Sequence, residues 1–348
     1  MKYCNYGSHR VMTPKNTLPQ AALKIDNTMT CFDNEMLIDV ETLNIDSASF
    51  HQIKEACNYD IEAMKTMILE IVNHQGKMQN PVTKSGGMLI GKVHQVGKDF
   101  HRQDLKQGTK IATLVSLSLT PLKIDKIKQV HIENEQVDIE GQAILFNSGI
   151  YAVIPEDLDQ HLVLAALDVA GAPAQVKRLA KKDDTVVIIG AAGKSGLLCA
   201  LQAKKNVGPK GHVIGVVNEA WQIDVLNELK LCDEIILADA TKPLEVYQKV
   251  SEVTKGKLAD LTLNVVNVEN TEMTTILATK DLGTVYFFSM ATSFTKAALG
   301  AEGIGKDVTM IVGNGYCKDH AKITLDLLRE YPHIKTYFET KYTQGGIR

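Results

Sequence analysis

The sequence predicts an α/β protein with a β-rich domain first and a doubly wound parallel sheet after it. The chain has 348 residues, which is enough for two separate hydrophobic cores. Short strand-like segments separated by turns occupy residues 1–160, whereas strands and helices alternate from Asp183 onward. We therefore place a β-rich domain at residues 1–165, a domain of alternating strands and helices at 166–317 and a C-terminal return to the first domain at 318–348.

The β-rich domain consists of short runs of apolar and β-branched residues that are bounded by turns. We expect strands at Glu35–Val40, Met88–Val96, Lys110–Leu117, Gln142–Phe146 and Ile150–Val153. One helix is expected from Asp60 to Val72. Short strands with frequent turns are typical of a compact β domain.

The second domain alternates strands with helices, so its strands should be parallel. Strands are expected at Val186–Ile189, Val213–Val217, Glu234–Leu237, Leu261–Val266, Val285–Ser289 and Val308–Val312. Helices are expected between them, for example at Trp221–Leu231 and Thr271–Lys280. In such a sheet a dinucleotide lies at the carboxyl ends of the strands, where the strand order switches.

The last part of the chain should hold one helix and one strand. The helix is expected at Lys318–Glu330, because Pro332 interrupts the pattern after it. A strand is expected at Ile334–Thr340. We expect this tail to pack on the first domain.

A glycine-rich loop, Gly190–Gly196, connects the first strand of the second domain to a helix. The Gly-Lys-Ser within it suggests an NTPase phosphate loop, but that loop needs a glycine where Ile188 stands in a strand. The strand–turn–helix context instead predicts a dinucleotide site, in which Gly193 lets the backbone approach a pyrophosphate and Gly196 lets the helix pack on the strand. The alternative is a plain turn without a ligand. The candidate cofactor residues in the loop are Gly190, Ala192, Gly193, Lys194, Ser195 and Gly196.

Further cofactor contacts are expected where later strands end. NAD-binding sheets usually carry an acid after the second strand, and Val217 stands at that position, followed by Asn218 and Glu219. Glu219 favours NAD if it reaches the ribose, but it could instead open the next helix. Because no arginine lies nearby for a 2′-phosphate, we expect NAD and leave NADP possible. The nicotinamide is expected near Val266, Asn267, Ser289, Met290 and Thr292, although ordinary polarity at strand ends would also explain them.

Composition excludes several classes of function. The net charge of −3 shows no basic excess, so no nucleic-acid partner is expected. Residues 1–10 lack the apolar core of a signal peptide, and no stretch approaches the roughly 20 apolar residues of a membrane span. We expect a cytoplasmic protein without a membrane partner. The six cysteines form no Cys-x-x-Cys pair and the ten histidines no His-Glu-x-x-His, so no metal site is proposed.

Several motifs resemble the medium-chain dehydrogenase/reductase superfamily. The loop Gly190–Gly196 resembles its quinone-oxidoreductase fingerprint, Gly86–Val93 its early Gly-His-Glu segment, and Gly108–Ala112 its Gly-Asp-x-Val turn. This resemblance implies a GroES-like first domain and a Rossmann second domain. Gly87 and Met88 stand where zinc-dependent members carry His and Glu, and the structural-zinc cysteines are missing, so zinc catalysis is not expected.

A narrower resemblance covers nearly the whole chain. The opening Gly7–Val11 with Leu18–Gln20, the stretch Leu43–Phe50 and Asn264–Asn267 are similar to the L-erythro-3,5-diaminohexanoate dehydrogenase family. The resemblance implies NAD(P)-dependent oxidative deamination of (3S,5S)-3,5-diaminohexanoate to 5-amino-3-oxohexanoate in lysine fermentation, and we expect a homodimer. Without this narrower resemblance, composition and spacing predict only the class of zinc-less nicotinamide oxidoreductases. A zinc-less quinone or enone reductase and a non-enzymatic cofactor binder are the alternatives.

Deamination requires a base, because the amine must be neutral when hydride leaves. The resemblance places Asp46 and Ser47 in the loop that corresponds to the first zinc-ligand region of zinc-bearing relatives, and His51 could relay a proton. These three are the candidate catalytic residues, although Asp46 or Ser47 could simply cap a helix. Arg10 and Lys15 could bind the substrate carboxylate, or they could be surface charges of a terminal segment.

Overall fold

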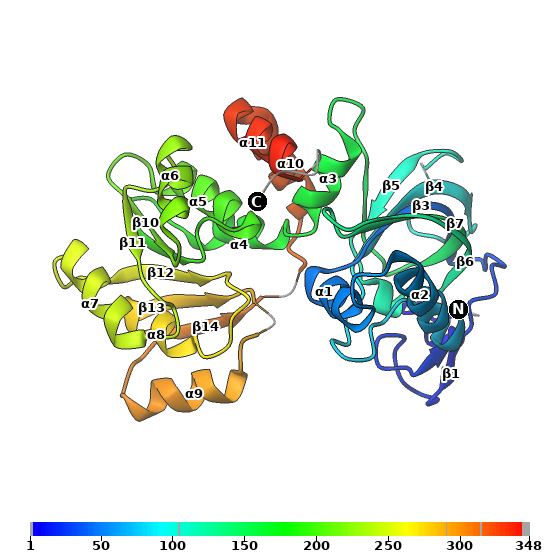
Figure 1. The fold of residues 1–348 in the computed structure, drawn as a ribbon, viewed down its shortest axis with the longest axis horizontal. Coiled ribbons are helices and arrows are strands. Elements are labelled where there is room, and N and C mark those ends of the chain that lie inside the picture. The colour runs from blue at the N-terminus through cyan, green and yellow to red at the C-terminus, as the bar shows by residue number, and fades with distance from the viewer. Residues whose placement is uncertain (1–2, 104, 290, 314, 343–348) are drawn as a thin grey trace. The chain divides into compact units, whose positions relative to one another are not determined.

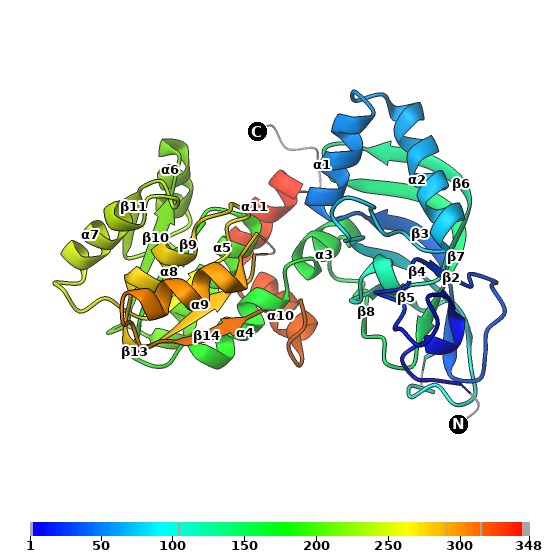
Figure 2. The same cartoon turned by 90° about the horizontal axis from the view of Figure 1, so that it is seen from below.

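The computed structural model describes residues 3–103, 105–289, 291–313 and 315–342. The chain folds into two compact units, Met1–Asp168 with Phe338–Arg348 and Val169–Tyr337. Figure 1 and Figure 2 show the ribbon from two sides. No described helix is long and apolar enough to cross a membrane.

Unit 1 is built around a six-stranded antiparallel sheet with the strand order β6-β7-β3-β4-β5-β8. Its strands are β3 (Glu35–Asn44), β4 (Met88–Val96), β5 (Lys110–Thr113), β6 (Leu122–His131), β7 (Gln136–Phe146) and β8 (Tyr151–Val153). A two-stranded sheet pairs β1 (Val11–Thr13) with β2 (Lys24–Ile25). The prediction of a β-rich first domain is confirmed, but β6 was missed because polar residues interrupt its apolar pattern.

The helices of unit 1 begin at side-chain caps. Asp46 caps α1 (Ser47–Ala56), Asp60 caps α2 (Ile61–Gln75) and Asp159 caps α3 (Gln160–Leu167), and in each case the carboxylate accepts a first-turn backbone N–H. Helix α2 confirms the helix predicted at Asp60–Val72. Two short 3-10 turns complete the unit, η1 (Ser8–Arg10) and η2 (Leu117–Leu119), so the strand predicted at Lys110–Leu117 ends earlier, at Thr113.

Unit 2 contains a six-stranded sheet whose strands are all parallel. They are β9 (Thr185–Ile189), β10 (His212–Val217), β11 (Glu234–Leu237), β12 (Ala259–Asn264), β13 (Thr279–Phe287) and β14 (Thr309–Val312). The order β11-β10-β9-β12-β13-β14 is that of a doubly wound sheet, with the switch between β9 and β12. The predicted parallel sheet is confirmed, and its strands formed because continuous β-branched runs suit burial on both faces.

Helices cover both faces of this sheet (Figure 1). One layer holds α4 (Gly171–Leu179), α5 (Lys194–Val207) and α10 (His320–Glu330), which contact one another. Helix α6 (Ala220–Glu228) lies on the same side in Figure 1. The other layer holds α7 (Pro243–Val253), α8 (Glu272–Ala278) and α9 (Phe294–Gly303). Because α10 packs on α4 and α5, the second unit extends to Tyr337, beyond the predicted boundary at residue 317.

The strand predicted at Ile334–Thr340 is wrong. This segment belongs to helix α11 (Pro332–Tyr342). Ile334 and Phe338, which are four residues apart, are both fully buried, and this spacing places them on one face of a helix. Pro332 at the start favours the helix, since proline is preorganised for the first helical turn.

Candidate functional site

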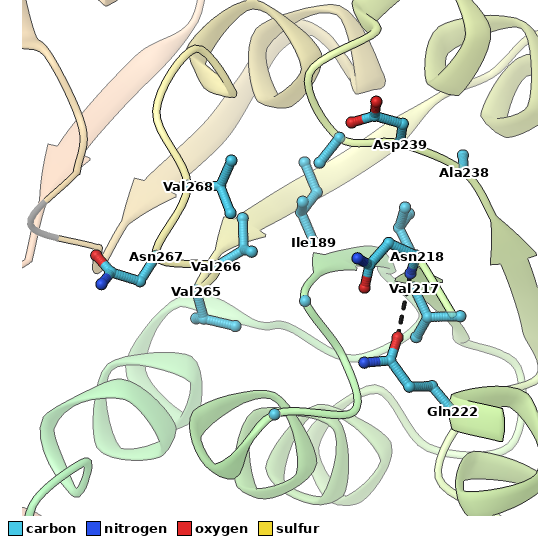
Figure 3. Close-up of a pocket in the computed structure, with 14 residues that line it drawn as sticks. Ile189, Val217, Asn218, Gln222, Ala238, Asp239, Val265, Val266, Asn267 and Val268 are labelled. Carbon is cyan, nitrogen blue, oxygen red and sulfur yellow. Dashed lines mark hydrogen bonds between the residues drawn. The ribbon is translucent and has the colours of Figure 1, made fainter. Parts of the chain in front are cut away.

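A cavity of about 310 Å³ opens at the carboxyl ends of the first four strands of unit 2. Figure 3 shows Asn218 and Gln222 on one side of it, Val266 and Val268 on the other, and Asp239 at one end. The lining residues are Ile189, Gly190, Gly193, Val216, Val217, Asn218, Gln222, Ala238, Asp239, Ala240, Val265, Val266, Asn267 and Val268. This is the position at which a doubly wound sheet holds a dinucleotide.

The glycine loop forms the floor of the cavity, and its glycines have different roles. Gly190 has a φ of +89°, which favours glycine. At Gly193 a Cβ would meet only the Gly190 oxygen, at 3.5 Å, so the free space at this residue belongs to the cavity. At Gly196 a Cβ would lie 2.2 Å from the same oxygen, so a glycine is needed for α5 to pack on β9. The packing role predicted for Gly196 is confirmed.

The cradle at Gly193 fits a phosphate group. Gly193 is the N-cap of α5 and has no side chain to cap the helix. The first N–H groups of a helix lack intrahelical partners, and the helix dipole favours an anion there. The oxygens of a dinucleotide pyrophosphate at this point would accept hydrogen bonds from those N–H groups, and no side chain at residue 193 would block them.

The other residues predicted in the loop do not line the cavity. Ala192 is buried, and Lys194 and Ser195 lie in the first turn of α5, outside the cavity lining. Asn218, Val266 and Asn267 do line it, as predicted contacts should.

Ser289 and Thr292, which are described residues after β13, do not line the cavity either. The Ser289 hydroxyl accepts the Ala291 N–H at 3.1 Å, and the Thr292 Oγ1 is buried without a hydrogen-bond partner among the described residues. Met290 lies outside the described residues.

Glu219 opens a helix instead of lining the cavity. It is the N-cap residue of α6, and the Gln222 Oε1 accepts the backbone N–H groups of Asn218 at 3.1 Å and Glu219 at 3.2 Å. The structure therefore favours the capping alternative over the ribose contact. Asp239 and Gln222 line the cavity and were missed. Asp239 follows the third strand, and its position after an apolar strand was the signal that could have found it.

The catalytic candidates lie together at the start of α1 in unit 1. Asp46 Oδ1 accepts the Ser49 N–H at 3.0 Å, so the capping role is real, but Oδ2 is buried and has no hydrogen-bond partner among the described residues. Ser47 Oγ donates to Glu135 Oε2 at 2.5 Å. Sequence reasoning missed Glu135, because only the pairing of β3 with β7 brings it to this loop.

His51 lies one helical turn from Ser47, on the same face of α1. Its side chain is 66% exposed, and Nε2 lies 4.0 Å from Glu55 Oε1. The ring is therefore open to solvent.

Gly87 packs against the loop that carries Asp46. Its φ is +92°, and a Cβ there would lie 2.0 Å from the Asn44 oxygen and 2.7 Å from the Asp46 nitrogen. No side chain, including that of a histidine, fits at this position without a shift of the loop. Within the described residues, no group of three or more His, Cys, Asp or Glu could hold a metal ion.

The prediction that Arg10 binds the substrate is wrong. Arg10 is 1% exposed, and its guanidinium donates to both carboxylate oxygens of Glu35 at 2.6 and 2.7 Å. It also donates to the Thr28 and Thr30 carbonyls at 2.8 and 2.7 Å. These contacts use the guanidinium inside the fold, so no ligand carboxylate can reach it.

Lys15 is exposed and donates to the Val11 carbonyl at 2.9 Å. In Figure 1 and Figure 2 the N-terminal segment with β1 lies apart from α1 within unit 1. The hydrogen bond of the Lys15 side chain is therefore made within its own N-terminal segment.

The pKa of Glu35 is lowered by the residues that contact its carboxyl group. Burial raises the pKa of this carboxyl, but the hydrogen bonds from Arg10 and His9 outweigh burial and hold it below its ordinary value. His9 Nε2 lies 2.8 Å from Glu35 Oε1. This ion-pair cluster fastens the N-terminal segment to β3.

Comparisons with known proteins agree with this architecture. The family described as L-erythro-3,5-diaminohexanoate dehydrogenase N-terminal domain matches residues 9–155. The fold is shared with the CurK enoyl reductase (TM-score 0.55, 15% identity, 93% of this chain and 84% of that one). It is also shared with a mycobacterial quinone oxidoreductase (0.55, 16%, 92% and 86%) and a mycobacterial protein in complex with NADPH (0.54, 14%, 92% and 85%). The fold expected from the sequence, a GroES-like and a Rossmann domain, is thus shared with these proteins.

Two curated relatives match along nearly the whole chain, and both are named L-erythro-3,5-diaminohexanoate dehydrogenase. The protein of Acetoanaerobium sticklandii is 57% identical over 343 residues, which are 98% of this chain and 100% of that protein. The protein of Fusobacterium nucleatum subsp. nucleatum is 58% identical over 342 residues, which are 98% and 99%. The chain belongs to the L-erythro-3,5-diaminohexanoate dehydrogenase family.

Proposed function

We propose that this protein catalyses the NAD-dependent oxidative deamination of (3S,5S)-3,5-diaminohexanoate to 5-amino-3-oxohexanoate, a step of lysine fermentation. The full-length match to two dehydrogenases of this name is the observation that carries the proposal. The cavity at the switch point of unit 2 agrees with it, because its glycine cradle fits a dinucleotide.

NAD is the proposed cofactor. The described residues that line the cavity include no lysine or arginine, and a 2′-phosphate needs a cation. When bound, the nicotinamide supplies the acceptor for the hydride.

We assign the proton chemistry to the loop before α1. The substrate ammonium must lose a proton before hydride leaves, and Asp46 Oδ2 accepts no hydrogen bond among the described residues. This oxygen is shielded from solvent in the structure, so the substrate must displace the atoms that cover it before Asp46 can take the proton. Ser47 and Glu135 form a second acceptor beside it and can hold the ammonium group through charge-assisted hydrogen bonds. His51 can pass a proton to water, since its ring is exposed.

Turnover with a set of substrates tests the function. The purified protein is incubated with NAD and either the diamino acid or a simple β-amino acid. In separate reactions it is incubated with reduced cofactor and a quinone. We expect cofactor reduction and equimolar ammonia release only with the diamino acid. Quinone reduction without ammonia release would support the alternative, a zinc-less quinone or enone reductase. Cofactor binding without any turnover would support a non-enzymatic binder.

We also propose a homodimer. Strand β14 pairs with β13 on one edge, and within the described residues no strand covers its other edge. Phe294 and Leu299 on α9 are 72% and 62% exposed. Unpaired edges and exposed apolar side chains favour association. Light scattering at micromolar concentration decides between one and two chains.

The cytoplasmic location remains a prediction from the sequence.

A further inference from the structure

Asp239 occupies a defined place at the end of the cavity. It follows β11, whose residue Leu237 is paired with Val217 of β10. The Ala238 N–H donates to the Val217 carbonyl at 2.8 Å, so the two strand ends continue side by side into Asn218 and Asp239. Figure 3 shows Asp239 at one end of the group of lining side chains.

The carboxylate of Asp239 is oriented by its own turn. Oδ1 accepts the Thr241 backbone N–H at 2.9 Å and the Thr241 hydroxyl at 2.7 Å. These bonds from Thr241 lower the pKa of Asp239, so the group is ionised at neutral pH. Both involve Oδ1, which leaves Oδ2 able to accept bonds from a ligand.

Asp239 is also the ionisable side chain among the described residues that line the cavity. Val217, at the usual acidic position, has no polar side chain, and Glu219 serves as the N-cap of α6. The acid that reads the ribose must therefore come from elsewhere if the chain has one.

We infer that Asp239 accepts hydrogen bonds from the adenosine-ribose hydroxyls and is the residue that makes this chain prefer NAD to NADP. The inference rests on the proposed nicotinamide chemistry for the cofactor alone and not on the amino-acid substrate. A carboxylate bonds a vicinal diol, whereas it repels a 2′-phosphate that finds no cation in the lining. The third strand thus provides a function that the second strand usually provides.

Two lysines, Lys242 and Lys194, are the cations that would have to bind a 2′-phosphate if the chain preferred NADP. Lys242 acts on Asp239 electrostatically, and its backbone N–H bonds the Asp239 carbonyl at 3.0 Å, but it does not line the cavity. Lys194 follows Gly193 in the glycine loop and does not line it either. If either lysine recruited a 2′-phosphate, its removal would weaken NADPH selectively.

Equilibrium binding tests the inference on the full chain without any amino-acid substrate. The single tryptophan, Trp221, is adjacent to Gln222 of the lining and reports NADH or NADPH by energy transfer. We compare wild type with Asp239→Asn, with the rival acid variant Glu219→Gln and with Asp224→Asn, a charge-matched control on α6 outside the lining. Lys242→Gln and Lys194→Gln test the two cations.

Wild type should bind NADH more tightly than NADPH. Asp239→Asn should weaken NADH by about ten- to a hundredfold, the worth of a hydrogen bond to a charged group, and weaken NADPH less or not at all. Asp224→Asn should leave the ratio unchanged. The inference is overturned if Asp239→Asn weakens both cofactors equally, which indicates an adenine contact, or if Glu219→Gln changes the ratio instead. Selective loss of NADPH binding in either lysine variant, or NADPH preference in wild type, would also overturn it.

The proposed function fails separately. If the protein deaminates the diamino acid with NADP in preference to NAD, the deamination activity stands, whereas the choice of NAD and the role of Asp239 are both wrong. If it binds NAD through Asp239 but turns over no diamino acid, the role stands and the function falls.

Discussion

Asp46 combines a structural bond with an unused oxygen. Oδ1 caps α1 and Oδ2 is buried without a partner among the described residues, so the cap accounts for only half of the carboxylate. Asp46→Asn keeps a capping oxygen but cannot take a proton. We expect kcat/KM for the diamino acid to fall by about 10²–10⁴, with the thermal midpoint nearly unchanged.

The matched control for Asp46 is Asp60→Asn, the same substitution at the N-cap of α2, where the carboxylate accepts the Ala63 N–H at 2.7 Å. This variant should have normal turnover. If Asp46→Asn also turns over normally, Asp46 is not the base, and His51 becomes the next candidate.

Arg10 stabilises the fold and does not recognise substrate. Arg10→Met leaves Glu35 buried without its main partner, and breaking a buried pair from one side costs about 3–5 kcal/mol. We expect a large fall in the thermal midpoint and an unchanged KM for the diamino acid, measured at a temperature where the variant stays folded. Lys15→Gln, at an exposed site in the same segment, should change stability by less than about 0.5 kcal/mol. A raised KM in Arg10→Met with an unchanged midpoint would restore Arg10 as a substrate contact.

At the scale of elements, the glycine loop separates cofactor binding from packing. Gly193→Val places its side chain in the cavity, where a Cβ meets only the Gly190 oxygen at 3.5 Å. We expect the protein to fold and its affinity for NADH to fall at least tenfold, about 1.4 kcal/mol. Gly196→Ala should do the opposite and lower the thermal midpoint, because its Cβ would lie 2.2 Å from that oxygen. Intact NADH affinity in folded Gly193→Val would show that the loop holds no pyrophosphate.

Lys77 fastens the end of α2 to the N-terminal segment. It is fully buried, and its Nζ donates to the carbonyls of Pro19 at 2.6 Å and Gln20 at 3.3 Å. Burial lowers the pKa of Lys77 to about 8 from 10.5. Between these pH values the unfolded chain keeps a proton that the folded chain has released, so the free energy of unfolding rises with pH. Below pH 8 both states are protonated and the cost of burial is complete.

This linkage predicts a pH-dependent difference between wild type and Lys77→Met. The thermal midpoint of wild type should rise relative to that of the variant between pH 8 and pH 10, because only wild type carries this titrating amine. Lys65→Met, at an ion-paired site on α2, is the control for the replacement of a lysine by methionine in this part of unit 1. A constant difference for Lys77→Met would mean that Lys77 does not titrate in this range.

At the scale of the whole molecule, the proposed chemistry is divided between the two units. The cavity proposed for the dinucleotide is lined by described residues of unit 2, and the loop of Asp46 belongs to unit 1. The glycine at position 87 leaves no room for a histidine beside that loop. We therefore expect purified, active protein to contain less than about 0.1 zinc per chain and to keep its activity after chelation, since a catalytic zinc would need three protein ligands. Stoichiometric zinc, with activity lost on its removal, would contradict this expectation.

The sequence by itself determined the features that depend on neighbours along the chain. Buried parallel strands such as Val186–Ile189 are continuous β-branched runs. The turn at Gly190–Gly196 can be recognised because Gly190 has a positive φ, which favours glycine. The doubly wound sheet and the glycine turn between β9 and α5 could therefore be predicted, whereas dinucleotide binding by that turn stays a prediction. The residues Asp46 and Ser47 could be proposed from family resemblance, but not their partner Glu135.

Only the tertiary structure decided what depends on residues distant in sequence. Asp239 lines the cavity because β11 pairs with β10. Arg10 is buried because its guanidinium donates hydrogen bonds to Glu35 of β3. The tail formed α11 because burial of both Ile334 and Phe338 outweighs the strand propensity of their neighbours. In each case the deciding free energy is that of burial and pairing between distant segments, and no local pattern carries it.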